Sequence, residues 1–365
     1  MKRVISLILF VAITTGVCSS AQPTISPALA KQIDEIVEKA RTAQKLPAVS
    51  IAIEVGGHVV YKKAYGFADL ENDLRATPET LIRTGSIAKP MTAVGAMELV
   101  EQGKLDLDAP IQKYCPAFPV KKWPITTREL LGHLSGIRHY EGKEMDSTVH
   151  YSSTADGMII FKNDPLLFQP GEKFAYTTYG YTAVGCVMEG ASGQKYEDYM
   201  ATHVFAPAGM THTFVDDFHI VPHRARGYEK DEAGNVVNSG PMDSSYKVPG
   251  GGYVSTAEDL VKFAAAVTEH KLLKPATTTT MWTSLHTNDG KETRYGLGWG
   301  LADLDGVRIY AHTGGQQGTS TSLLVMPSRD MASAVMINMQ YIDAAELNRQ
   351  IASLVLKQYV APSGR

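Results

Sequence analysis

The 365-residue sequence lacks the signatures of several common kinds of site. It has no Gly-x-Ser-x-Gly segment, which argues against the nucleophile elbow of an α/β-hydrolase, and no His-Glu-x-x-His zinc motif. No run of Lys and Arg stands out, and the net charge is −3, so charge gives no reason to expect a nucleic-acid partner. The N-terminal apolar run, residues 4–17, is shorter than the ~18 residues that a membrane span needs.

Residues 1–21 have the pattern of a secretory signal peptide. Lys2 and Arg3 precede the apolar run, and Ser19-Ser20-Ala21 supplies the small residues typical of a cleavage site. Cleavage would leave residues 22–365 in the periplasm or outside the cell.

Cysteine is scarce, with three residues in the whole chain. A lipid anchor on Cys18 is the alternative to cleavage, and the bulky Val17 before it disfavours that anchor. Removal of the signal leaves Cys115 and Cys186. They could pair in an oxidising compartment or remain buried thiols, and their spacing does not decide between the two.

Hydrophobic patterns place strands near both ends of the chain and helices between them. Apolar residues at helical spacing predict the helices, and runs of strand-favouring residues predict the strands, the first two of which are joined by the Gly56-Gly57 turn. The expected strands are 48–55, 58–64, 307–312, 319–326 and 332–339. The expected helices are 28–46, 90–102, 126–134, 178–192, 256–268 and 343–359. The simplest arrangement is one catalytic domain over 22–365. An α/β lobe comes from about 28–80 and 290–360, with an antiparallel sheet and terminal helices, and a mainly helical lobe is inserted over about 81–289.

Three Ser-x-x-Lys pairs occur, and only the first begins an apolar helix. Ser86 precedes a helix that Gly103 ends, so its hydroxyl would lie beside free backbone N–H groups and the positive helix end. Lys89 lies one turn later on the same face, where burial would leave a neutral amine able to accept the serine proton. The alternative is an N-cap serine beside a surface lysine. We expect solvent exposure for the other two pairs, Ser192/Lys195 and Ser244/Lys247.

Two further segments carry chemistry. Tyr176 lies in the segment Phe-Ala-Tyr-Thr-Thr-Tyr-Gly-Tyr before a predicted helix, where the alternative to a proton-transfer role is aromatic packing. His312-Thr313-Gly314-Gly315 lies on an expected strand, and its glycines would let a substrate approach the backbone closely. The alternative for this second segment is a turn at a strand end.

Ser86-x-x-Lys89, followed by the tyrosine and His-Thr-Gly motifs, resembles the serine β-lactamase and penicillin-binding-protein superfamily. The resemblance is closest to the class C-like branch with D,D-peptidases, D-amino-acid peptidases and esterases, and it spans about residues 30–355. Supporting strings are 130–137, 251–257 and 295–299, and residues 135–140 are similar to mitochondrial β-lactamase-like members. The resemblance implies a two-lobed, β-lactamase/transpeptidase-like α/β fold with the site between the lobes.

The resemblance also implies a role for each motif. Ser86 is the nucleophile, and Lys89, with Tyr176, removes its proton. Tyr176 then protonates the leaving group, while the backbone N–H groups of Ser86 and Gly315 form the oxyanion hole. No metal or cofactor is required. The implied substrate-binding residues are Thr178, His312, Thr313 and Gly314.

Two positions depart from the family pattern. Thr178 stands where Asn is usual and lacks the amide donor of Asn. His312 stands where β-lactamases commonly have Lys; a cationic His312 bound to a substrate carboxylate predicts a KM that rises between about pH 6 and 8. Both departures favour esters or small and D-configured peptides over β-lactams.

We therefore expect a secreted serine hydrolase that acts on ester or amide bonds of a small molecule or peptide through an acyl-enzyme. One alternative is a β-lactamase that hydrolyses penicillins or cephalosporins. The other is a non-catalytic acyl-binding or self-assembling protein of the same fold. The sequence leaves the oligomeric state open.

Overall fold

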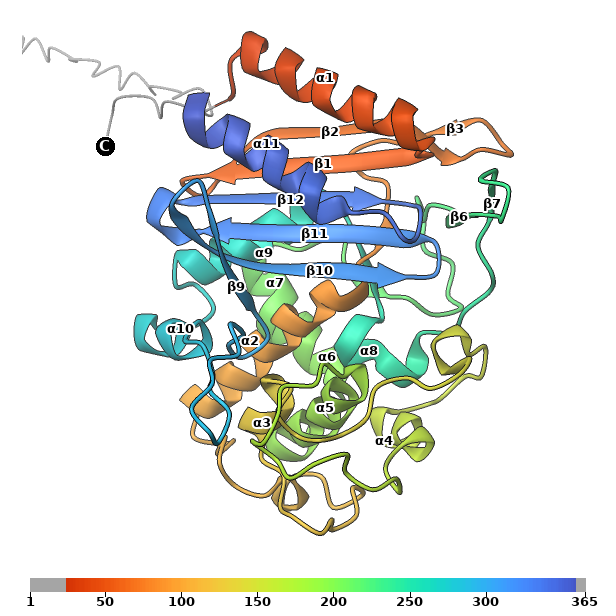
Figure 1. The fold of residues 1–365 in the computed structure, drawn as a ribbon. Helices are drawn as coiled ribbons and strands as arrows, with labels where there is room; N and C mark the ends of the chain where they lie inside the picture. Colours follow the sequence, from red (N-terminus) through yellow and green to blue (C-terminus); the bar gives the residue numbers. More distant parts are fainter. Residues whose placement is uncertain (1–23, 359–365) are drawn as a thin grey trace, which may run out of the picture.

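A computed structural model describes residues 24–358, and one antiparallel sheet lies at its centre (Figure 1). The strand order is β3-β2-β1-β12-β11-β10-β9, so a strand from the N-terminal part pairs directly with one from the C-terminal part. The mixed α/β fold with a sheet built from both chain ends is thereby confirmed. The strands are β1 (Ala48–Val55), β2 (His58–Asp69), β3 (Leu74–Arg75), β9 (Gly300–Leu304), β10 (Val307–Gln316), β11 (Thr319–Met326) and β12 (Met331–Ile337).

Helices α1 (Pro27–Gln44) and α11 (Ala344–Gln358) lie together over one face of the sheet (Figure 1). The Ser26 hydroxyl accepts a hydrogen bond from the Leu29 N–H and caps α1. Both helices present an apolar stripe to the strands, and burying each such side chain contributes about 1.5–3 kcal/mol. The buried residues of these stripes include Leu29, Ile33, Val37, Leu347, Ile351 and Val355.

Helix α9 (Ala257–Thr268) packs against β1, β2 and β12 of the sheet. Helix α2 (Ala88–Glu101) is buried around most of its circumference and packs against α5 (Thr178–Ser192) and α8 (Val248–Gly251). A helix that is apolar on all sides fits only the interior, so α2 forms the centre of the helical part. The remaining α-helices are α3 (Thr127–Leu131), α4 (Thr154–Gly157), α6 (Tyr196–Met200), α7 (Ala206–Ala208) and α10 (Pro275–Met281).

Some elements differ from the sequence-based expectation. α9 packs on the sheet, although its residues fall within the segment expected to form the helical lobe. Strand β9 was not expected, nor were two small sheets whose strands of two or three residues are too short to show alternation. The small sheets contain β4 (Ile82–Arg83), β8 (Tyr253–Ser255) and β5 (Phe214–Val215), and β6 (Tyr228–Lys230) and β7 (Val236–Asn238).

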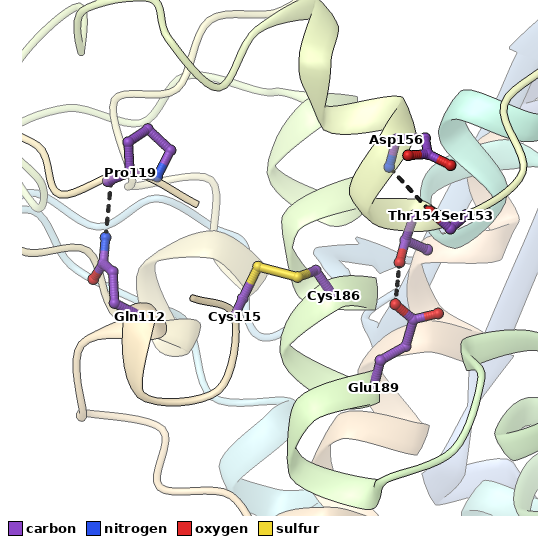
Figure 2. The surroundings of a disulfide bond; sticks show 8 residues. All are labelled: Gln112, Cys115, Pro119, Ser153, Thr154, Asp156, Cys186 and Glu189. Carbon is purple, nitrogen blue, oxygen red and sulfur yellow. Dashed lines mark hydrogen bonds between the residues drawn. A yellow bond between two sulfur atoms is a disulfide. The ribbon is translucent and has the colours of Figure 1, made fainter. Parts of the chain in front are cut away.

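Cys115 and Cys186 form a disulfide bond, which answers the question that their spacing left open (Figure 2). The bond joins residues 71 positions apart and links the loop after residues 111–113 to helix α5. Such a cross-link stabilises a fold mainly by restricting the unfolded chain. Because α5 begins two residues after Tyr176, the bond also anchors the helix that follows the tyrosine motif.

Within residues 24–358, no helix combines the length and the apolar character needed to cross a bilayer. The predicted signal peptide, residues 1–21, and Cys18 lie outside the described residues. The cleavable export signal therefore stays a prediction.

Candidate active site

Ser86 lies on the short 3-10 helix η1 (Gly85–Ile87), immediately before α2. The preceding Gly85 has a φ of 52°, and a Cβ on it would lie 2.8 Å from the backbone nitrogen of Gly315. Glycine is required there for both reasons, since other residues rarely adopt that φ and no side chain fits the gap. The close approach places Ser86 next to strand β10, where the sheet meets the helices.

The Lys89 side chain is fully buried beside Ser86. Its Nζ lies 2.9 Å from the Ser86 Oγ, 2.7 Å from the Gly250 carbonyl oxygen and 3.2 Å from the Thr178 Oγ1. A neutral amine has two N–H donors and one lone pair, so it can donate to Gly250 and Thr178 while accepting from the serine hydroxyl. Burial, assisted by the charge of Lys247, holds the pKa of Lys89 well below its ordinary value, which favours that neutral form.

The structure brings Tyr176 to the same point. The Lys89 Nζ lies 4.8 Å from the centre of the Tyr176 ring. Burial raises the pKa of Tyr176, and a hydrogen bond with the Ser86 side chain opposes that rise. Tyr176 is therefore a protonated phenol at neutral pH, hydrogen-bonded to the Ser86 side chain.

Two neutral histidines hold the tyrosine segment at the start of α5. The Nδ1 of His133 accepts a hydrogen bond from the Thr177 N–H at 3.1 Å, and that of His139 accepts from the Thr178 N–H at 3.2 Å. Burial lowers the pKa of His133 well below its usual value and that of His139 to about 4, so both rings remain uncharged acceptors. The His133 ring also lies 4.3 Å from the Tyr176 ring.

Thr178 does not have the position expected of a substrate-binding residue. It is 4 % exposed, and its hydroxyl accepts a hydrogen bond from Lys89 and also hydrogen-bonds Tyr140. The Thr178 hydroxyl thus helps to hold the Lys89 amine in place beside Ser86. The sequence could not distinguish these roles, because Lys89 and Thr178 are 89 positions apart.

Strand β10 places two glycines against the serine turn. A Cβ on Gly314 would lie 2.0 Å from the Thr84 carbonyl oxygen, so the strand could not approach with any other residue there. A Cβ on Gly315 would meet no atom within 4 Å, which shows open space on that side of the strand. The backbone N–H groups of Ser86 and Gly315, the expected oxyanion donors, therefore lie on adjoining segments beside an open edge.

His312 is a buried, neutral residue. Its Nδ1 lies 2.6 Å from the Thr313 carbonyl oxygen and its Nε2 lies 2.9 Å from the Tyr295 hydroxyl. The ring therefore donates from Nδ1 and accepts at Nε2. Burial and the charge of Lys89 lower the pKa of His312 to about 3. This corrects the expectation of a cationic His312, and with it the predicted rise of KM between about pH 6 and 8.

The exposed Thr313 lines two cavities. One, of about 510 Å³, is lined by Tyr176, His312 and the cationic Arg349 of α11. The other, of about 350 Å³, runs along residues 313–316 toward Met145. The described residues contain no group of three His, Cys, Asp or Glu side chains placed to hold a metal ion.

One of the two remaining Ser-x-x-Lys pairs differs from expectation. Lys195 is exposed, as expected, but Ser244 and Lys247 are 0 % and 2 % exposed. The Ser244 hydroxyl donates to an Asp216 carboxylate oxygen at 3.1 Å, whereas the Lys247 Nζ lies 3.3 Å from the Met242 sulfur, so the two side chains have different partners. The polar sequence around residue 244 concealed a buried segment at the start of α8.

Comparison of the sequence with known proteins identifies its family. The Beta-lactamase family model matches residues 33–356. The mitochondrial serine β-lactamase-like protein LACTB of Homo sapiens is 32% identical over 84% of this chain and 74% of its own.

Solved structures agree with these sequence relatives. The octameric penicillin-binding protein homologue of Pyrococcus abyssi superimposes with a TM-score of 0.79 at 27% identity, over 90% of this chain and 77% of that one. A D-amino acid amidase from Ochrobactrum anthropi has the same fold, with a TM-score of 0.79 at 24% identity over 91% of this chain and all of its own. The chain therefore belongs to the β-lactamase family of serine β-lactamase-like proteins and penicillin-binding proteins.

Proposed function

We propose that the protein is an active-site-serine hydrolase that cleaves ester or amide bonds through an acyl-enzyme. The observation that carries this proposal is the buried Lys89 amine, whose Nζ lies 2.9 Å from the Ser86 Oγ. Burial lowers the pKa of Lys89 and so favours the neutral form, whose lone pair can accept the serine proton. Family membership supports the same chemistry.

In the first half of the reaction, the Lys89 amine takes the Ser86 proton while the Oγ bonds to the substrate carbonyl carbon. The carbonyl oxygen becomes an oxyanion, which the N–H groups of Ser86 and Gly315 stabilise; losing one such donor costs about 3 kcal/mol in other hydrolases. The bond to the leaving group then breaks as the proton passes from Lys89 through Tyr176 to the departing nitrogen or oxygen.

In the second half, water attacks the acyl-enzyme carbonyl and gives up a proton to the Lys89–Tyr176 pair. Collapse of the second oxyanion returns a proton to the Ser86 oxygen and releases the carboxylic acid. Lys89 ends as the neutral amine with which it began. Every step uses groups of this chain and one water molecule.

Ser86→Ala tests the proposal directly. We expect it to abolish p-nitrophenyl acetate hydrolysis and fluorophosphonate labelling, with mass spectrometry locating the label on Ser86 in the wild-type protein. Ser192→Ala, a change in the pair with the exposed lysine, is the matched control and should keep full activity. Full turnover by Ser86→Ala would refute the assignment.

A side-by-side assay of nitrocefin, a D-Ala-D-Ala peptide and a p-nitrophenyl ester distinguishes the three candidate substrate classes. The neutral His312 and the engagement of Thr178 with Lys89 favour the ester and the peptide over the β-lactam. Efficient nitrocefin turnover would identify a β-lactamase instead. Labelling without turnover of any substrate would identify a non-catalytic acyl-binding protein.

We also propose export to the periplasm or the cell exterior. The disulfide between Cys115 and Cys186 supports an oxidising compartment, because such bonds rarely persist in the cytosol. Cell fractionation followed by N-terminal sequencing tests this: periplasmic or secreted protein that starts at Gln22 is expected, and protein that stays in the cytosol with residue 1 intact would contradict the proposal.

A further inference from the structure

The cavity of about 510 Å³ is bounded on one side by Tyr176 of the serine site and on the others by residues of β9, β10, β11 and α11. Its volume lies in the range of ligand pockets in proteins, about 300–1,000 Å³. Tyr176 hydrogen-bonds the Ser86 side chain, so the cavity lies next to the position of the reacting bond. A group attached to the substrate carbonyl can therefore reach it directly.

Small side chains leave the space that the cavity occupies. Ala302 on β9, Ala311 on β10 and Ala345 on α11 line it, and each is only partly buried. Because these side chains end at Cβ, larger residues at the same positions would project into the cavity. The buried side chains of Ile309 and Leu324 line it as well. Much of the wall is therefore apolar.

The polar residues of the wall already have hydrogen-bond partners. The Tyr295 hydroxyl donates to His312, whose other ring nitrogen donates to the Thr313 carbonyl oxygen, and the Ser322 Oγ accepts from the Asn348 Nδ2 at 3.1 Å. Among the described residues that line the cavity, no buried side-chain nitrogen or oxygen lacks a partner. A polar group that entered would lose its hydrogen bonds to water without replacement, whereas an apolar group would lose none.

Two charged residues line the cavity, and both are exposed and paired. The Asp303 carboxylate lies 3.1 Å from the Arg308 Nε, and the Arg349 Nη2 lies 3.0 Å from a Glu346 carboxylate oxygen. Because water and these partners already stabilise both charges, neither requires an ionic ligand. An apolar group is therefore the ligand that the cavity fits best.

Tyr176 determines which part of the substrate enters. In the mechanism proposed above, Tyr176 gives its proton to the leaving group, so that group lies on the side of the cavity that Tyr176 lines. We propose that the cavity binds an apolar leaving group, so that the enzyme prefers esters and amides whose alcohol or amine part carries an apolar chain. The proposal rests on the acyl-enzyme function and narrows its substrate class.

The test measures release of acetate from ethyl, butyl and hexyl acetate. The three alcohols have nearly the same acidity, so the intrinsic reactivity of the ester bond changes little along the series. Complete burial of one methylene corresponds to about a fourfold gain, and we expect hexyl acetate to exceed ethyl acetate by about tenfold or more in kcat/KM. Equal values along the series, or no hydrolysis of any of the three esters, would overturn the proposal.

Ethyl hexanoate is the matched control for the side of the ester that carries the chain. It is an isomer of hexyl acetate, with the long chain on the acyl part instead of the alcohol part. We expect kcat/KM to be higher for hexyl acetate. A higher value for ethyl hexanoate would place the chain in the acyl part and contradict the assignment of the cavity to the leaving group.

Ala311→Leu fills part of the cavity and should lower the ratio of hexyl to ethyl acetate in kcat/KM by about fivefold or more. Ala276→Leu, at an exposed position of α10, is the matched control and should leave the ratio unchanged. Ala302→Leu should act as Ala311→Leu does, and it keeps the test decisive if Ala311→Leu does not fold. A folded Ala311→Leu that retains the full ratio would refute the proposal.

The failures of the two proposals are distinguishable. A flat series of alkyl acetates with Ser86-dependent turnover intact contradicts only the role of the cavity. Turnover that persists in Ser86→Ala contradicts the acyl-enzyme function, whatever the preference for the alcohol.

Discussion

Thr178→Val separates the role that the structure gives Thr178 from the role that the sequence predicted. Valine has nearly the same shape as threonine but cannot accept the Lys89 N–H, which now lies 3.2 Å from the Thr178 Oγ1. Both side chains are buried, so water does not replace the lost acceptor. An unsatisfied buried donor costs about 1–3 kcal/mol, which corresponds to a fall of about 5- to 160-fold in kcat if the cost falls on the reactive orientation of Lys89.

Steady-state hydrolysis of a p-nitrophenyl ester measures kcat and KM separately. We expect kcat to fall and KM to change little, because the Thr178 hydroxyl accepts from Lys89 and the residue is only 4 % exposed. Thr178→Ser restores the hydroxyl and should recover most of the rate. A higher KM with unchanged kcat would refute this reasoning and return Thr178 to the substrate-binding residues.

The remaining predictions concern stability. Replacing Cys115 and Cys186 by Ala should cost about 4 kcal/mol for a 71-residue loop and lower the melting temperature by about 6 °C in calorimetry; an unchanged value would contradict the loop-entropy argument. Gly314→Ala should destabilise the fold by about 1–3 kcal/mol or more, since its Cβ would lie 2.0 Å from the Thr84 carbonyl oxygen. Gly315→Ala is the control in the same melting assay, because its Cβ would have no atom within 4 Å. Burial raises the pKa of Glu54 to about 7, with Glu269 and Asp330 adding to the rise, so the folded state holds this proton more tightly than the unfolded state. That contribution is complete below about pH 4.5 and is lost as the pH rises through 7. Glu54→Gln should therefore raise the melting temperature at pH 8 and leave it nearly unchanged at pH 4.5.

The sequence predicted the fold wherever a local pattern was long enough to read. The strands 48–55 and 319–326 and the helix 178–192 have the predicted bounds, because each combines a clear period with turn or cap residues at its ends. The order of the motifs along the chain was sufficient to predict that Ser86, Lys89 and Tyr176 lie together. These inferences needed only neighbouring residues or a family pattern.

The sequence could not show which groups share a hydrogen bond across the fold. The Gly250 carbonyl oxygen that binds Lys89 lies 161 positions away, and no pattern along the chain marks a backbone oxygen as an acceptor. Lys247 lies in a polar stretch, and its burial results from the tyrosines that pack around it in three dimensions. The charge state of His312 depends on burial and on Lys89 in the same way.

The electrostatics of the site explain why these missed features matter. Burial holds the pKa values of Lys89, His133, His139 and His312 low, so the groups around Ser86 are largely uncharged at neutral pH. An oxyanion formed there meets oriented N–H dipoles in a medium that screens them weakly, which strengthens their effect on the transition state. The proposed role of Lys89 as a base requires its neutral form, and burial together with the charge of Lys247 lowers the pKa of Lys89 toward that form. A substrate carboxylate would raise the pKa of that base if it bound beside it.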